Sequence, residues 1–133
     1  MPMQCPRLVV TPMPKPITST SRHSAPAKKG KWPTIFTLCG YTSATMPLNP
    51  ATFGHRCVTV NMSIRGTGAS GGKLSPWRPR SWQDGHEVIE KWIVKQPWSN
   101  GRVGTFGISY PGMSAQMITT VDHPAVRASI PAF

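Results

Sequence analysis

From Trp32 to Phe133 the sequence alternates short apolar runs with loops and helical patterns. Segments rich in β-branched residues are typical of buried strands. Four such segments occur in order: PTIFTL, HRCVTVNMSI, RVGTFGI and AVRASIPAF. Helical patterns precede the third and fourth of them, in DGHEVIEKWIVKQ and GMSAQMITTVDH. This order is that of a parallel sheet with right-handed crossovers, so we expect an α/β fold.

DGHEVIEKWIVKQ gives the clearest helical signal. Asp84 is a candidate N-cap, and Glu87 and Lys91 are placed to pair across one turn of the outer face. Apolar residues recur at spacings of one, three and four, which predicts an amphipathic helix with one buried stripe. The stripe consists of Val88, Ile89, Trp92 and Ile93.

The segment before Trp32 has a different composition. The first 33 residues hold seven of the 15 prolines. Proline fixes φ and removes a backbone donor, so we expect residues 1–31 to form an irregular basic arm. At most a short strand is predicted there, near Leu8 to Val10. We therefore divide the chain into this arm and an α/β domain over residues 32–133.

Charge is distributed unevenly along the chain. Residues 1–83 contain eleven Lys and Arg and no acid, so the net charge of +11 arises there, and residues 84–133 are balanced. The basic residues form no dense block and no run of aromatic residues lies between them, so a specific nucleic-acid site is not expected. The three cysteines, Cys5, Cys39 and Cys57, have no metal-ligand spacing, which favours free, mostly buried thiols in a reducing compartment.

No secretory signal or membrane-spanning run is evident, so a cytoplasmic location is favoured and no membrane contact is expected. Neither a cofactor nor a metal ion is implied by the sequence, and it leaves the oligomeric state open.

A serine stands between glycines in GISYPG, after one predicted strand and before the next helix. Gly107, Ser109 and the following residues nearly fit the G-x-S-x-G pattern, in which a sharp strand-to-helix turn exposes a nucleophilic serine. Pro111 takes the place of the second glycine, and Gly112 follows it. Proline is well suited to the first turn of a helix. The pattern therefore suggests a serine nucleophile, and an ordinary tight turn is the alternative.

A second glycine cluster matches a nucleotide-binding pattern. Gly66, Gly68 and Gly71 satisfy G-x-G-x-x-G, which binds a dinucleotide only where a helix begins at the loop. Pro76 and Pro79 follow and disfavour a helix at that point. We expect a loop without nucleotide.

Three stretches together resemble the family of X-Pro dipeptidyl-peptidases, cocaine esterase and related acyl esterases, which are serine hydrolases of the α/β-hydrolase fold. The stretches are VTVNMSIRGTGASGG, DGHEVIEKWIVKQPWSNGRVGTFGISYPGMSAQM and HPAVRASIPAF. The resemblance covers roughly Trp32 to Phe133, and the family's G-x-S-Y-x-G fits GISYPG as it stands.

The resemblance implies a role for three residues. Ser109 would be the nucleophile, and the backbone N–H of Tyr110 would be one oxyanion donor. Tyr41, in LCGYTSA, would supply a hydroxyl as the second donor, although packing of its ring on the core is an equal alternative. Arg65 and the glycines after it match the family's RGTGxSGG loop, which we interpret as structural support.

A serine needs a base, and in this fold the Asp or Glu and then the His follow far downstream. Only 24 residues follow Ser109. His123 is separated from the serine by the length of the intervening helix, about 20 Å, so it cannot be the base. The other histidines, His23, His55 and His86, form no triad or metal site with their neighbours.

We therefore expect an N-terminal part of an α/β-hydrolase, ending before the acid and base and nearly inactive by itself. Its parent would hydrolyse esters or peptide bonds after proline in small-molecule or peptide substrates. The N-terminal arm departs from the family because it has no acidic residue. The alternative is a small basic binding protein that contacts RNA or acidic surfaces through a hydrolase-like scaffold without activity.

Overall fold

The computed structural model describes residues 9–12, 20–24, 26, 29–41, 50–53, 56–68 and 70–133. The predictions for Cys5, Leu8 and His55 lie outside these residues. At His23 only the backbone is described.

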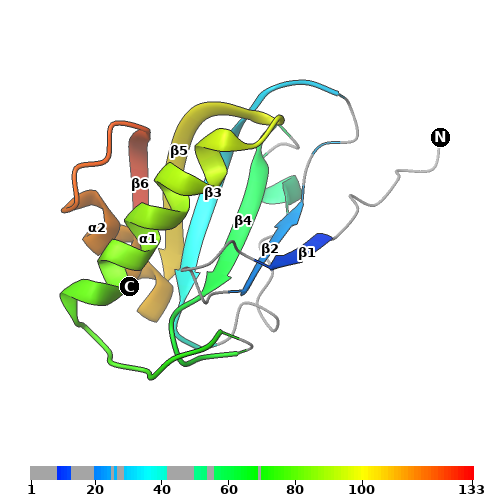
Figure 1. Ribbon diagram of the computed structural model, residues 1–133. Helices are drawn as coiled ribbons and strands as arrows, with labels where there is room; N and C mark the ends of the chain where they lie inside the picture. The colour runs from blue at the N-terminus through cyan, green and yellow to red at the C-terminus, as the bar shows by residue number, and fades with distance from the viewer. Residues whose placement is uncertain are drawn as a thin grey trace.

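Within the described residues, six strands form one sheet in the order β1-β2-β4-β3-β5-β6 (Figure 1). The strands are β1 (Val9–Pro12), β2 (Thr20–Ser24), β3 (Trp32–Cys39), β4 (Val58–Ser63), β5 (Ser99–Ile108) and β6 (Val126–Ala132). From β4 to β6 all neighbours are parallel, whereas β1 and β2 pair antiparallel with each other and β2 pairs antiparallel with β4. The expected α/β fold with a mostly parallel sheet is confirmed.

The N-terminal segment contains more regular structure than its prolines suggest. We expected at most one short strand there, near Leu8 to Val10, and this expectation is wrong. Strands β1 and β2 form an antiparallel pair, in which Val9 lies opposite His23, and β2 continues the sheet beside β4. Proline is tolerated in this position because edge strands leave some backbone donors unused.

Two α-helices connect the parallel strands: α1 (Pro79–Lys91) before β5, and α2 (Tyr110–Thr119) before β6. Two short 3-10 helices, η1 (Pro50–Phe53) and η2 (Ile93–Lys95), complete the regular elements of the described residues. Both helices lie on the same face of the sheet (Figure 1), and at their crossing Gly85 of α1 adjoins Ile118 of α2 and Leu38 of β3.

The start of α1 differs from the prediction. The helix begins at Pro79 and not after Asp84, and its N-cap is Arg78 without a side-chain capping bond. Proline at the first helical position loses no hydrogen bond, because the first N–H groups of a helix have no intrahelical acceptor. As a result Asp84 is buried inside α1, and His86 lies in the middle of the helix. The predicted Glu87–Lys91 pair is confirmed, with 3.2 Å between Oε2 and Nζ.

The core lies between the sheet and the two helices. The predicted stripe is buried there together with Phe36, Leu38 and Val103 of the sheet. The helix ends earlier than predicted, at Lys91, and the stripe continues through Trp92 to Ile93 of η2. Cys39 and Cys57 are buried free thiols, as expected for two of the three cysteines. No helix among the described residues has the length and apolar character needed to cross a membrane.

Candidate active site

Two neighbouring strands bring Tyr41 and Ser109 to one edge of the sheet. β3 and β5 are adjacent and parallel, Tyr41 comes two residues after β3, and Ser109 directly follows β5. The chain leaves β3 toward β4 on one side and returns through α1 to β5 on the other side. Open α/β sheets bind ligands outside the carboxyl ends of the strands at such a reversal of strand order.

The backbone at Ser109 is strained. Its φ is +61° and its ψ is −125°, and it is one of three non-glycine residues with positive φ in the described part of the chain. Such a conformation costs about 1–3 kcal/mol and persists only where the surrounding structure enforces it. The Ser109 N–H donates to the carbonyl of Ala132 at 2.9 Å, and the side chain remains exposed at the N-terminus of α2.

The flanking glycines are required by close backbone approach. A Cβ atom on Gly107 would overlap the carbonyl group of Pro111, and one on Gly112 would overlap the carbonyl oxygen of Ala132. The spacing of the two glycines around Ser109 therefore follows from the sharpness of this turn and from the contact between α2 and β6.

Two possible donors lie beside the serine hydroxyl. The Tyr41 hydroxyl is 3.5 Å from Ser109 Oγ, and Tyr41 is 55% exposed, so its ring is not simply packed into the core. Tyr110 is the first residue of α2, and its N–H has no intrahelical acceptor. Both groups can donate to an oxygen held close to Ser109, and the helix N-terminus favours negative charge there.

The Tyr110 side chain belongs to a cluster of rings that the sequence did not reveal. Its ring stacks on Trp77 with centroids 4.4 Å apart, and it lies 5.7 Å from the ring of Tyr41. The Tyr110 ring also lies so close to Gly40 that there is no room for a Cβ atom on that glycine. Burial raises the pKa of the Tyr110 phenol, and Cys39 and Tyr41 contribute to the same effect, so this hydroxyl stays neutral.

The glycine loop after β4 is held in place by a buried ion pair. Arg65 donates to both carboxylate oxygens of Asp84, at 2.9 and 2.7 Å, and Asp84 is only 4% exposed. Arg80 adds a third contact to that carboxylate at 3.1 Å. This pair joins the RGTGASGG loop to α1 and agrees with a supporting role. One sequence signal could have predicted it, because a helix that begins at Pro79 contains Asp84 in its interior.

Neither histidine with a described side chain lies near Ser109. His123 follows the far end of α2, whose ten residues span about 15 Å. Its ring packs against His86 of α1 with centroids 4.7 Å apart, and its Nδ1 accepts the Ala125 N–H at 3.0 Å. Burial lowers the pKa of His123, and His86 lowers it further. The prediction that His123 is not the base agrees with this placement.

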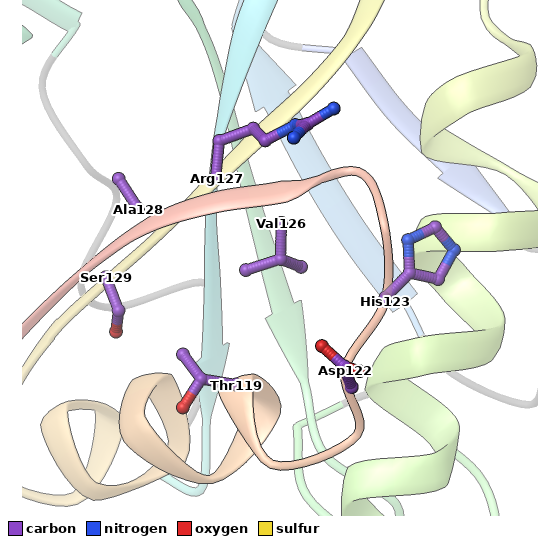
Figure 2. A pocket seen from close by; sticks show the side chains of 7 residues that line it. All are labelled: Thr119, Asp122, His123, Val126, Arg127, Ala128 and Ser129. Atoms are coloured by element: carbon purple, nitrogen blue, oxygen red, sulfur yellow. The ribbon is translucent and has the colours of Figure 1, made fainter.

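A cavity of about 220 Å³ adjoins His123 and not Ser109. Its lining includes Asp122, Val126 and Ser129, from the turn after α2 and from β6, and Figure 2 shows that His123 points from this turn toward α1. The cavity therefore lies at the opposite end of α2 from the serine. Among the described side chains, no three potential metal ligands lie close enough together to hold an ion.

Comparison with known proteins places this geometry in a family. The family model described as X-Pro dipeptidyl-peptidase (S15 family) matches residues 20–133. Over 75 residues the chain is 44% identical to "Putative serine esterase Mb1866c" of Mycobacterium bovis. The aligned residues make up 56% of this chain and 12% of the relative. The chain thus spans about an eighth of the length of that relative.

Solved structures agree with the match. A CocE/NonD family hydrolase from Staphylococcus aureus superposes with a TM-score of 0.80 at 27% identity, over 94% of this chain and 26% of that one. An aminopeptidase from a Thaumarchaeota archaeon superposes with a TM-score of 0.76 at 25% identity, over 95% and 25% of the two chains.

Proposed function

Because this chain belongs to the X-Pro dipeptidyl-peptidase (S15) family, we propose that it carries the nucleophile and the oxyanion hole of a serine acyl hydrolase. The observation that carries the proposal is the pairing of a strained, exposed Ser109 with the hydroxyl of Tyr41 at 3.5 Å. The turn around Ser109 then serves as a nucleophile elbow.

In the proposed reaction, Ser109 Oγ attacks the carbonyl carbon of an ester, or of a peptide bond after proline. The serine proton passes to a base, and the carbonyl oxygen becomes an oxyanion bound by the Tyr41 hydroxyl and the Tyr110 N–H. The alcohol or amine leaves with a proton, and water then hydrolyses the acyl-serine. Each oxyanion donor contributes about 3 kcal/mol to lowering the barrier.

The base is the part of this mechanism that the described residues do not supply. His86 and His123 contact each other at the end of α2 that is remote from Ser109. We therefore propose that these 133 residues alone turn over esters poorly and that a histidine and a carboxylate from outside them complete the site.

A chimera tests this proposal. Residues 32–133 would replace the matching quarter of the S. aureus CocE/NonD hydrolase, and p-nitrophenyl acetate hydrolysis would be measured for the chimera and for the isolated chain. We expect Ser109-dependent hydrolysis by the chimera and background hydrolysis by the chain. A folded chimera whose rate is unaffected by Ser109→Ala would contradict the assignment of the nucleophile. Hydrolysis by the isolated chain that Ser109→Ala abolishes would contradict its predicted inactivity.

The uneven charge favours a second candidate, a basic protein that binds RNA or acidic surfaces without catalysis. Two of the cations involved, Arg65 and Arg80, are engaged by Asp84, which weakens this candidate. Binding to a polyanion that falls steeply with salt and is unchanged by Ser109→Ala, together with an inactive chimera, would favour it.

A further inference from the structure

We propose that Trp77 is a specificity-determining residue, whose exposed ring holds a flat apolar group next to the substrate's reacting carbonyl. The inference rests on the proposed acyl hydrolase function and adds the class of substrate: esters or amides with an aromatic or similarly flat apolar group beside that carbonyl.

A continuous row of rings joins Trp77 to the candidate nucleophile. Trp77 stacks on Tyr110 at 4.4 Å with 33° between the ring planes, and Tyr110 contacts Tyr41 at 5.7 Å. The Tyr41 hydroxyl is 3.5 Å from Ser109 Oγ. The ring of Trp77 therefore stacks on the residue that directly follows Ser109, and this residue also contacts Tyr41.

The exposure of Trp77 is unusual for its residue type in this chain. Trp77 is 44% exposed, whereas Trp82 and Trp92 are 8% and 5% exposed. Ile108 and Met113, which flank Ser109 in sequence, are also exposed. Exposed apolar side chains beside a few polar groups are typical of a small-molecule site.

The backbone of Trp77 is strained as well. Its φ is +59°, a region that a bulky residue rarely adopts. Contacts with Tyr110 and Trp82, the latter at 6.3 Å, hold the ring in this conformation. Strained residues cluster at functional sites, where the surrounding structure enforces them. The structure thus keeps a partly exposed tryptophan in an unfavourable conformation, on the ring of the residue that follows Ser109.

The surface under Trp77 is rigid. Tyr110 contacts both Trp77 and the backbone of Gly40, where any Cβ atom would collide with the Tyr110 ring. A rigid aromatic surface loses little entropy when a ligand binds, which favours affinity for flat apolar groups.

Binding of unreactive amides to the 133-residue chain tests the proposal. The probes are N-benzylacetamide and N-methylacetamide, which differ in the aromatic group. The readout is the dissociation constant from backbone-amide chemical shifts, together with the shift of the Trp77 indole N–H resonance in the unmodified chain. We expect N-benzylacetamide to bind at least tenfold more tightly than N-methylacetamide. Trp77→Phe keeps a ring and should retain most of this preference.

Trp77→Asn is the matched variant, because asparagine accepts positive φ but has no ring. It should keep the thermal midpoint within a few degrees and lose the preference for the benzyl amide. If Trp77 had only a structural role, Trp77→Asn would instead lower the thermal midpoint and leave any preference for the benzyl amide in place. Equal binding by Trp77→Asn and the unmodified chain, or no shift of the Trp77 resonance, would overturn the proposal.

The amide probes separate this inference from the proposed function. Neither probe requires a nucleophile, so the Ser109→Ala chain should bind both as the unmodified chain does. A chimera without Ser109-dependent hydrolysis would contradict the assignment of Ser109 as the nucleophile. This outcome is independent of whether the chain prefers the benzyl amide.

Discussion

Gly112 lies against the carbonyl of Ala132, so closely that a Cβ atom on Gly112 would overlap that oxygen. The same oxygen accepts the Ser109 N–H at 2.9 Å. One carbonyl at the end of β6 thus holds both the serine and the first turn of α2. The strained turn at Ser109 depends on a strand that begins 17 residues later, at Val126.

Substitution of Gly112 should therefore destabilise the fold. Gly112→Ala forces α2 away from β6 and is expected to lower the free energy of unfolding by about 1–3 kcal/mol. Gly85→Ala is the control, because its Cβ would meet Ile118 at an ordinary 3.4 Å inside a helix. It should raise stability by about 0.5–1 kcal/mol. Urea unfolding measures both, and a loss of stability in the two variants alike would contradict the close contact at Gly112.

Because Asp84 pairs with Arg65, we expect the charge of Asp84 to contribute strongly to the free energy of unfolding. Asp84→Asn removes the buried carboxylate that contacts Arg65 and Arg80 and should cost about 1.5–3 kcal/mol of unfolding free energy, since hydrogen bonds to a charged group are lost. Glu87→Gln removes the partner of two half-exposed cations, Lys91 and Arg80, and should cost less than about 1 kcal/mol. Chemical denaturation that ranks the two variants equally would contradict the importance of the buried pair.

His123 makes the stability depend on pH. Burial, and then His86, lower its pKa in the folded protein below the ordinary value of 6.5, while Glu90 opposes this shift. The unfolded chain therefore binds the proton more readily, so stability is complete above about pH 6.5 and falls as the pH drops toward the folded pKa. The thermal unfolding midpoint should therefore decrease as the pH is lowered from about 7.5 to about 5.

Two variants check the cause of that decrease. His123→Asn retains an acceptor for the Ala125 N–H at 3.0 Å but does not titrate, so its stability should be nearly flat over this range. His86→Gln removes only the second cause and should keep most of the slope. A slope unchanged in His123→Asn would assign the effect to another group.

Tyr41 is expected to act on the transition state. In the chimera, Tyr41→Phe removes the hydroxyl that lies 3.5 Å from Ser109 Oγ and should lower kcat about 100-fold, with KM little changed. Because the side chain is 55% exposed, the unfolding midpoint should stay nearly constant. Equal activity of Tyr41→Phe and the unmodified chimera would leave the Tyr110 N–H as the donor and exclude the Tyr41 hydroxyl.

Local patterns were sufficient to predict the parallel strands and both helices, because β-branched runs and the stripe of α1 are formed by neighbours in sequence. They failed at Asp84, since its partner Arg65 lies 19 positions away and a capping residue looks the same in sequence. They also failed in the N-terminal segment, where β2 is a strand through its pairing with β4. The prolines and polar residues of this segment do not form a pattern that is typical of a strand.

The candidate site was predictable only in part. Gly107, Ser109 and Gly112 form a contiguous motif, and the family resemblance supplied Tyr41. Trp77 could not be identified, because its significance lies in a stack with a residue 33 positions later and in a positive φ that no local pattern reveals.

Labelling of Ser109 tests the central claim most directly. The 133-residue chain would be treated with a fluorophosphonate with and without added imidazole, which supplies the missing base, and the modified residue identified by mass spectrometry. Exposed Ser75 is the internal control. We expect imidazole to accelerate modification of Ser109 and not of Ser75, and Ser109→Ala to abolish the adduct. Equal labelling of the two serines, with or without imidazole, would contradict the assignment of Ser109 as a nucleophile.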